Sequence, residues 1–205
     1  MIVLVNYRVG NFGSILNMLK KMGIEATISS NISDIKKADK LILAGVGAYD
    51  NGMKNLIDLG LISVLTDKVI KDKTPILGIC LGMQLLTKQS EEGVLPGLGW
   101  IEGQTVKFKF NNNHKNLKVP HMGWNTVNTN KQSALFDGLN QESRFYFVHS
   151  YHVVCNDEND ILAKTSYGSE FVSAIQRDSI MGVQFHPEKS HKFGMKLLKN
   201  FVELF

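Results

Sequence analysis

The sequence predicts an α/β protein with a mixed, mainly parallel sheet flanked by helices and with added antiparallel strands in its second half. In the first half, short apolar runs alternate with segments whose apolar residues recur at helical spacing. This alternation is typical of a parallel sheet that is covered on both faces. The second half is mostly β-like, and 205 residues with 43% hydrophobic content suit a single domain spanning 1–205.

The first half contains four predicted strands and three predicted helical regions. Each strand is a short apolar run, and the first helix shows apolar residues three and four positions apart before Gly23. A break at Gly60 divides the second helical region. The predicted strands are 2–5, 26–28, 40–43 and 75–79, and the helical regions are 15–22, 53–71 and 81–88.

From residue 104 onward the pattern changes to β segments separated by polar turns. We expect these strands to pair antiparallel at one edge or end of the sheet. The predicted segments are 104–110, 125–129, 144–154, 161–167, 171–177 and 180–186, and 111–116 is the predicted exposed loop. The chain closes with an amphipathic helix whose apolar stripe is Phe193, Leu197, Leu198, Phe201, Val202 and Phe205.

Composition argues against nucleic-acid binding and against a membrane protein. The net charge is +4, but the lysines are scattered and no aromatic residues alternate with them. Two cysteines do not make a disulfide framework and indicate a reducing compartment. No leader peptide is visible, and no apolar stretch approaches the ~20 residues of a spanning helix. We therefore expect a cytoplasmic protein.

Cys80 lies in the segment Gly78-Ile79-Cys80-Leu81-Gly82, between a predicted strand and a predicted helix. Glycines two positions before and after it permit the sharp turn that presents a nucleophile at the carboxyl end of a parallel strand. The partial positive charge at the start of the next helix favours the reactive thiolate. A small buried hydrophobic cysteine is the alternative interpretation. The glycine frame favours the nucleophile.

A cysteine nucleophile usually needs a base, and His186 is the candidate. It ends the predicted strand 180–186, and Pro187 fixes the turn that follows. Glu188 is placed to accept a hydrogen bond from the second ring nitrogen and so to orient the imidazole. An ordinary surface pair or part of a metal site are the alternatives. No second paired-ligand motif accompanies this one, so we predict no metal.

An amide under attack becomes an oxyanion, which needs N–H donors. Leu81 N–H, directly after the nucleophile, is one candidate. The segment AGVGAY, 44–49, can supply a second, because its glycines let the backbone turn N–H groups toward the site. The alternative interpretation of this segment is a tight strand-to-helix connection.

Three motifs resemble those of the class I, triad-type glutamine amidotransferases: GICLGMQ (78–84), GVG (45–47) and QFHPEKS (184–190). Five stretches make the chain similar to the glutaminase subunits of imidazole glycerol phosphate synthases. They are NYRVGNFGSI, GVGAY, VPHMGWN, FYFVHSY and FHPEKS, and the resemblance runs along the whole chain. It implies a flavodoxin-like sheet, in agreement with the pattern above.

The resemblance implies a catalytic triad of Cys80, His186 and Glu188. In this family the sulfur attacks the side-chain amide of L-glutamine, the imidazole passes a proton to the leaving ammonia, and water releases glutamate from a thioester. No cofactor and no metal are implied. The groups implied to hold glutamine are Gly47, Gln84 and the backbone around His149, Ser150 and Tyr151, and the implied oxyanion donors are Val46, Gly47 and Leu81.

The same resemblance implies a heterodimer with a (βα)8-barrel synthase subunit. The barrel would receive the ammonia and make imidazole glycerol phosphate for histidine biosynthesis. Departures from typical members, at Asn6, at Ala44 and after Ser190, leave an alternative open. In it, a duplicated copy supplies ammonia for surface-polysaccharide sugars. A non-catalytic binding module and a cysteine hydrolase with other substrates are alternatives from different classes.

Met122 and Trp124, in the segment VPHMGWN, are large apolar residues beside turn residues. Because interface patches are enriched in such side chains, we expect this segment to contact the barrel and to transmit its state to the glycine loop 45–47. Packing of Trp124 in the core is the alternative interpretation.

Overall fold

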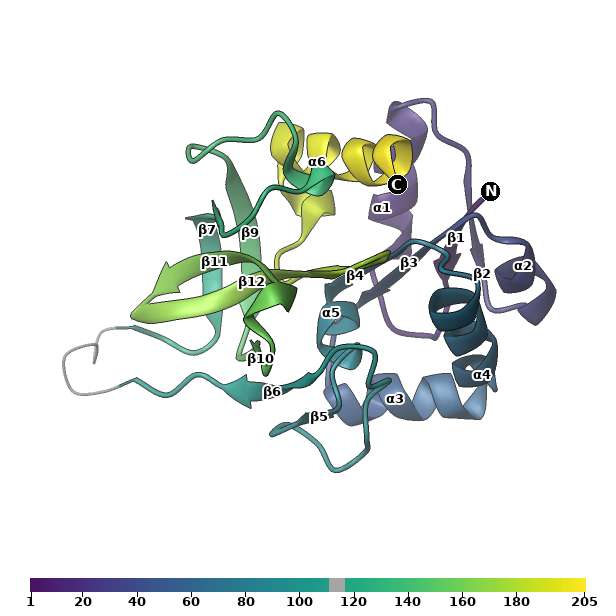
Figure 1. Ribbon diagram of the computed structural model, residues 1–205, viewed down its shortest axis with the longest axis horizontal. Coiled ribbons are helices and arrows are strands. Elements are labelled where there is room, and N and C mark those ends of the chain that lie inside the picture. Colours follow the sequence, from purple (N-terminus) through teal and green to yellow (C-terminus); the bar gives the residue numbers. More distant parts are fainter. Residues whose placement is uncertain (111–116) are drawn as a thin grey trace.

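The computed structural model describes residues 1–110 and 117–205, and the loop predicted at 111–116 lies outside them. A sheet runs through the middle of the molecule with helices on both sides (Figure 1). Its strand order is β2-β1-β3-β4-β13-β12-β10-β6-β5. The predicted α/β class is confirmed, because the parallel part of this mixed sheet carries the helices and the second half adds antiparallel strands.

Four strands from the first half and one from near the end of the chain form the parallel part. They are β1 (Ile2–Val5), β2 (Ala26–Ser29), β3 (Lys40–Gly45), β4 (Ile76–Cys80) and β13 (Ile180–Val183). Because β4 pairs in parallel with both β3 and β13, the carboxyl ends of these three strands meet at one edge. Ligands bind at this edge in sheets of this kind.

The helices cover both faces of the parallel part (Figure 1). On one face lie α1 (Phe12–Lys21) and α6 (His191–Leu204), and on the other lie α2 (Ile32–Lys37), α3 (Tyr49–Asp58), α4 (Leu61–Thr66) and α5 (Leu81–Leu85). A π-helical turn, η1 (Asp67–Lys71), continues α4. The predicted break is confirmed: Gly60 has a φ of +65°, in the left-handed region that ends a helix.

The second half adds antiparallel strands and a separate two-stranded sheet. The added antiparallel strands are β6 (Gly103–Lys107), β8 (Asn128–Thr129), β10 (Tyr151–Cys155), β11 (Ile161–Tyr167) and β12 (Ser169–Arg177). The short strand β5 (Gln89–Ser90) pairs in parallel with β6 at the edge of the sheet. The separate sheet consists of β7 (His121–Thr126) and β9 (Arg144–His149). Short 3-10 turns are η3 (Ala134–Phe136), η4 (Glu158–Asp160) and η5 (Pro187–Lys189).

Several predicted strands are wrong in their extent. The predicted strand 104–110 ends at Lys107, and 125–129 is the end of β7 followed by β8, in two different sheets. The segment 144–154 is two strands in two sheets, because the chain passes from one sheet to the other at Ser150. The sequence on both sides of that residue is rich in aromatic and β-branched residues, so the pattern does not reveal the change. The predicted strand 180–186 ends at Val183. His186 then bonds instead to β9, where its N–H donates to Tyr146 O at 2.9 Å.

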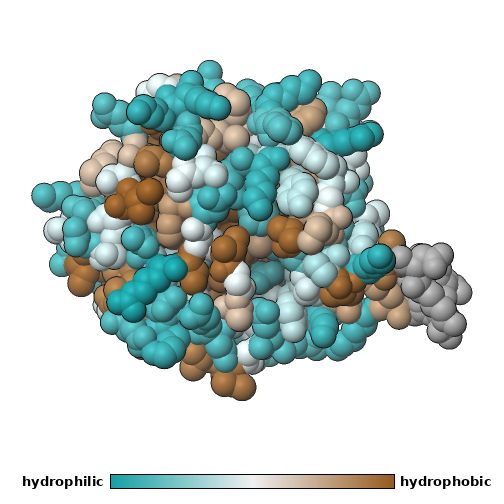
Figure 2. All heavy atoms as spheres, turned by 180° about the vertical axis from the view of Figure 1, so that it is seen from behind, coloured by the Kyte–Doolittle hydropathy of each residue, from teal (hydrophilic) through white to brown (hydrophobic). Residues whose placement is uncertain are grey.

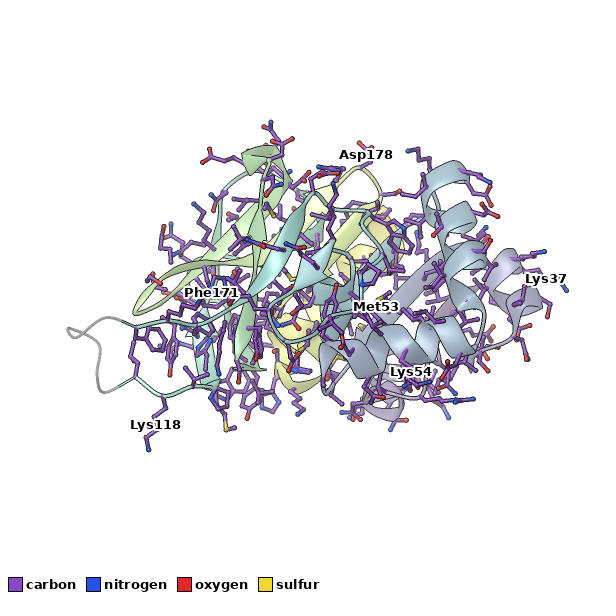
Figure 3. All side chains as sticks on the ribbon, turned by 90° about the horizontal axis from the view of Figure 1, so that it is seen from below. Lys37, Met53, Lys54, Lys118, Phe171 and Asp178 are labelled. Carbon is purple, nitrogen blue, oxygen red and sulfur yellow. The ribbon has the colours of Figure 1, made fainter. Side chains whose placement is uncertain are left out.

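Apolar side chains form one cluster on each face of the sheet. Leu197, Leu198 and Phe201, from the predicted stripe of the last helix, are fully buried. On the outside, apolar atoms reach the surface in several separate groups among polar ones (Figure 2). Figure 3 shows Lys37 and Lys118 projecting outward, whereas Phe171 lies inside.

Among the described residues, no helix has the length and apolar character that crossing a membrane requires.

Candidate active site

The predicted elbow is present at the junction of β4 and α5. Cys80 has φ 53° and ψ −107°, a strained backbone for a residue other than glycine. The flanking glycines leave no room for a side chain. A Cβ atom at Gly82 would lie 1.6 Å from Leu43 O, and one at Gly78 would lie 2.8 Å from Gly82 O. The glycines are therefore required by close backbone contacts. Since α5 has five residues, its dipole is weaker than expected for a full helix.

Replacing Gly82 by alanine should destabilise the fold. The new methyl group meets the carbonyl of Leu43, a backbone group of β3 that cannot move aside alone. We expect the free energy of unfolding to fall by about 2–3 kcal/mol, as overpacking in a core does. Urea unfolding measures this loss. Gly13→Ala is the matched control, because α1 has open space there and a helical alanine should add up to about 1 kcal/mol. Equal midpoints for the two variants would contradict the steric argument.

His186 reaches Cys80 because their strands are neighbours. β13 pairs in parallel with β4, with Val183 opposite Ile79. The two strands therefore end at the same edge of the sheet. His186 and Cys80 both line one cavity there. The imidazole is 1% exposed, and its Nδ1 lies 2.8 Å from Oε1 of the equally buried Glu188. The structure thus brings all three predicted catalytic side chains together.

The charge state of His186 follows from its two neighbours. Burial lowers the pKa of His186, but interactions with Cys80 and then Glu188 outweigh burial and raise this pKa to about 10. The protonated ring is therefore favoured at neutral pH. Nε2 is buried and forms no hydrogen bond with the described residues, although the ring interacts with Cys80. A sulfur beside such an imidazolium can attack an amide carbon, while the imidazolium gives its proton to the leaving nitrogen.

Ser190 anchors the catalytic segment, a role that the sequence did not reveal. Its buried Oγ donates to His186 O at 2.6 Å and accepts from Tyr146 N at 3.0 Å. These bonds fix the turn that carries His186 and Glu188 to β9. The serine was visible at the end of the motif QFHPEKS, but a hydroxyl in a turn has no distinctive pattern.

A cavity of about 360 Å³ lies over Cys80. Nine of the ten predicted site residues line it, and Glu188 stands behind His186. The nine are Val46, Gly47, Cys80, Leu81, Gln84, His149, Ser150, Tyr151 and His186. Three further lining residues were not predicted: Glu92, Pro120 and Val148. Glu92 is the chemically informative one, since it brings a carboxylate to the cavity. Its Oε2 accepts from Tyr49 N at 3.0 Å.

The glycine loop beside the elbow has the backbone freedom that was expected. Gly47 has a φ of +109°, and no atom lies within 4 Å of a Cβ built there. Its conformation, and not the available space, demands glycine. A backbone of this kind can turn an N–H group toward the cavity.

Two of the residues implied to hold glutamine form hydrogen bonds within the protein through their side chains. His149 directs its side chain away from catalysis: Nδ1 donates to Tyr151 O at 2.8 Å, and burial lowers the pKa of His149 to about 3. The neutral ring is thus a structural group. Gln84 uses both amide hydrogens within the protein, because Nε2 donates to Tyr151 O and to Gln184 Oε1, each at 3.1 Å. The Gln84 side chain therefore supports the cavity wall through these two hydrogen bonds.

Trp124 does not pack in the core, so that alternative is wrong. The side chain is 46% exposed and its ring stacks on His191, with the ring centres 5.3 Å apart. Met122, its neighbour on β7, is 61% exposed. Both residues belong to the strand that follows Pro120, which lines the cavity.

Within the described residues, no group of three His, Cys, Asp or Glu side chains could hold a metal ion.

An elbow cysteine at the end of a parallel strand, with an imidazole–carboxylate pair just after the neighbouring strand, forms a site suited to acyl transfer. Residues 3–204 match the family model described as glutamine amidotransferase class-I. The chain belongs to this family.

Relatives and solved structures agree with this assignment. The chain is 57% identical to "Imidazole glycerol phosphate synthase subunit HisH 2" of Methanococcus maripaludis, over 99% of each chain. It is 52% identical to the protein of the same name from Pseudomonas aeruginosa, over 100% of each. The crystal structure of a glutamine amidotransferase from Thermotoga maritima, 16% identical, has the same fold with a TM-score of 0.65, covering 99% of this chain and 80% of that one.

Proposed function

We propose that this chain is the cytoplasmic glutaminase subunit of an imidazole glycerol phosphate synthase, in histidine biosynthesis. One observation carries the proposal: the identity of 57% and 52% to relatives of that name extends over the full length. The site supports it, because Cys80, His186 and Glu188 provide every reactive group that a glutaminase needs. A non-catalytic binding module would have no reason to keep a strained cysteine.

The proposed reaction converts glutamine and water into glutamate and ammonia in two acyl transfers. The Cys80 sulfur bonds to the side-chain amide carbon, and the C–N bond breaks as His186 gives its proton to the nitrogen. Water then attacks the thioester carbon and returns a proton to His186. The C–S bond breaks, glutamate leaves, and the sulfur becomes a thiolate again. Glu188 holds the imidazole in the orientation that both proton transfers need.

Glutamine recognition uses other residues that line the same cavity. The Glu92 carboxylate suits the α-ammonium group of glutamine, and the backbone at Ser150 and Tyr151 suits the α-carboxylate end. Gln84 contributes indirectly by holding the Tyr151 carbonyl in place. The N–H groups of Leu81 and of the loop at Val46 and Gly47 stabilise the oxyanion that forms at the amide carbon.

The proposed partner is a (βα)8-barrel synthase subunit that receives the ammonia. Exposed apolar side chains near the cavity offer a surface for it. Val46 lines the cavity, and Val119, Met122 and Trp124 lie on either side of Pro120. Large apolar groups that remain exposed beside a catalytic cavity are typical of a protein–protein interface.

The barrel with its phosphorylated ligand should raise the glutaminase rate of this chain by roughly 10²-fold or more, which is the value of one correctly aimed oxyanion donor. Free ammonia is wasteful, so a subunit that feeds a channel gains from staying slow until its acceptor is bound. Trp124→Ala should reduce the stimulated rate more than the basal rate. Steady-state glutamate release, with and without barrel and ligand, measures both.

Ile57→Ala is the matched control, because Ile57 is equally exposed but lies on α3. It should leave the stimulation unchanged. Full activity of the isolated subunit would contradict dependence on the partner. Failure of the complex to form imidazole glycerol phosphate, with ammonia delivered instead to a sugar acceptor, would replace histidine biosynthesis by the alternative pathway.

A further inference from the structure

Gln184 is a fully buried polar side chain in contact with the sulfur of Cys80. It follows β13, two residues before His186, and none of it is exposed. Its Nε2 donates to Cys80 Sγ at 3.7 Å. Its Oε1 accepts from Gln84 Nε2 at 3.1 Å. Burying an amide is costly unless both of its ends are bonded, and here both are.

The direction of the Gln184 amide is determined by a backbone carbonyl. Tyr151 O can only accept, so the group that Gln84 presents to it must be the NH₂ group. The second hydrogen of that NH₂ group then points to Gln184, which must present its oxygen. The remaining end of Gln184, which meets the sulfur, is therefore an N–H donor. Reversing either amide would set two acceptors or two donors against each other.

A fixed donor at the sulfur distinguishes between the charge states of Cys80. A thiolate accepts an N–H hydrogen bond strongly, whereas a neutral thiol accepts it weakly. A donor that cannot rotate away therefore favours the ionised form. The sulfur carries this charge twice in the proposed cycle, before it attacks the amide and when the thioester breaks.

We propose that Gln184 is a further catalytic residue, whose amide N–H stabilises the ionised Cys80 sulfur and whose direction the Tyr151 carbonyl sets through Gln84. The inference rests on the proposed function, in which Cys80 is the nucleophile. It also gives Gln84 a defined task. Gln84 links the wall that holds glutamine to the atom that attacks it.

The test is the pH dependence of Cys80 alkylation by iodoacetamide, in which an S–C bond forms and iodide leaves. The full-length chain is used without glutamine, and peptide mass spectrometry follows Cys80 separately from Cys155. Gln184→Met removes the donor and keeps the length of the side chain. We expect the pH of half-maximal rate to rise by about one unit, a tenfold change in the ionisation equilibrium. Gln184→Glu is isosteric and adds a negative charge, so the rise should reach about two units.

Gln176→Met is the matched control, since Gln176 lies on β12 and bonds to Ser133 instead. Its alkylation profile should equal that of the wild type. An unchanged profile in folded Gln184→Met or Gln184→Glu protein would overturn the proposal, and the isosteric variant serves if the methionine variant does not fold. Glutaminase activity that survives Cys80→Ala would instead refute the proposed function. An inactive Cys80→Ala together with unshifted profiles refutes only the role of Gln184.

Discussion

Replacing Cys80 by alanine should reduce glutamine hydrolysis to the background rate, a loss of at least about 10⁴-fold by comparison with other enzymes that have lost a covalent nucleophile. Without the sulfur, no thioester forms and water must attack an unactivated amide. Synthesis by the complex from added ammonium salt should continue, because the barrel then receives ammonia without the glutaminase reaction. Paired assays with glutamine and with ammonium salt measure the two outcomes on one preparation.

Cys155→Ala is the control for this variant, as it removes the other cysteine. Cys155 lies on β10, and burial raises the pKa of its thiol to about 12, so it is unreactive at neutral pH. Its loss should change the glutaminase rate by less than about threefold. Glutamine hydrolysis that persists in a pure Cys80→Ala preparation would contradict the assignment of Cys80 as the nucleophile. Equal losses of activity in both variants would indicate an effect on folding.

The parallel part of the fold could be predicted because its strands are buried on both faces. Runs such as Leu41 to Leu43 then appear as continuous apolar segments, and Gly45 ends this strand. The helix α2 was missed because six residues, Ile32–Lys37, are too few to display a period of 3.6. The change of sheet at Ser150 was missed because β9 and β10 are both rich in aromatic and β-branched residues.

The site divides in a similar way between what local sequence encodes and what only the fold creates. The elbow was predictable, since the two glycines that its close backbone contacts require lie within two residues of Cys80 in the sequence. The catalytic role of Gln184 was not, because it depends on Gln84, one hundred positions earlier in the chain, and on a carbonyl of β10. Glu92 was missed for the same reason. It reaches the cavity from an exposed turn whose sequence carries no chemical signature.

His186→Ala should cost more than Glu188→Gln, and each should slow glutamine hydrolysis by at least roughly 10²-fold, as loss of general acid–base groups does. Alanine removes the proton donor to ammonia, whereas glutamine at 188 removes only the charge that orients the ring. Burial lowers the pKa of His186, and Cys80 and Glu188 together raise it to about 10. Removing the charge of Glu188 should therefore lower this pKa, so that His186 loses its proton earlier as pH rises. The alkaline limb of the pH–rate profile of Glu188→Gln should move to lower pH.

His152→Ala provides the matched control for both variants. The His152 ring packs against Phe108 and Phe171, with ring centres 4.7 and 5.9 Å away, and it does not belong to the cavity wall. Its loss should leave the position of the alkaline limb unchanged. The measurement is kcat for glutamate release between pH 6 and pH 10. If His186→Ala kept near wild-type activity while His152→Ala or His149→Ala lost it, the base would have been misassigned. A Glu188→Gln profile that was lowered but not displaced would mean that Glu188 supports the fold and does not tune the imidazole.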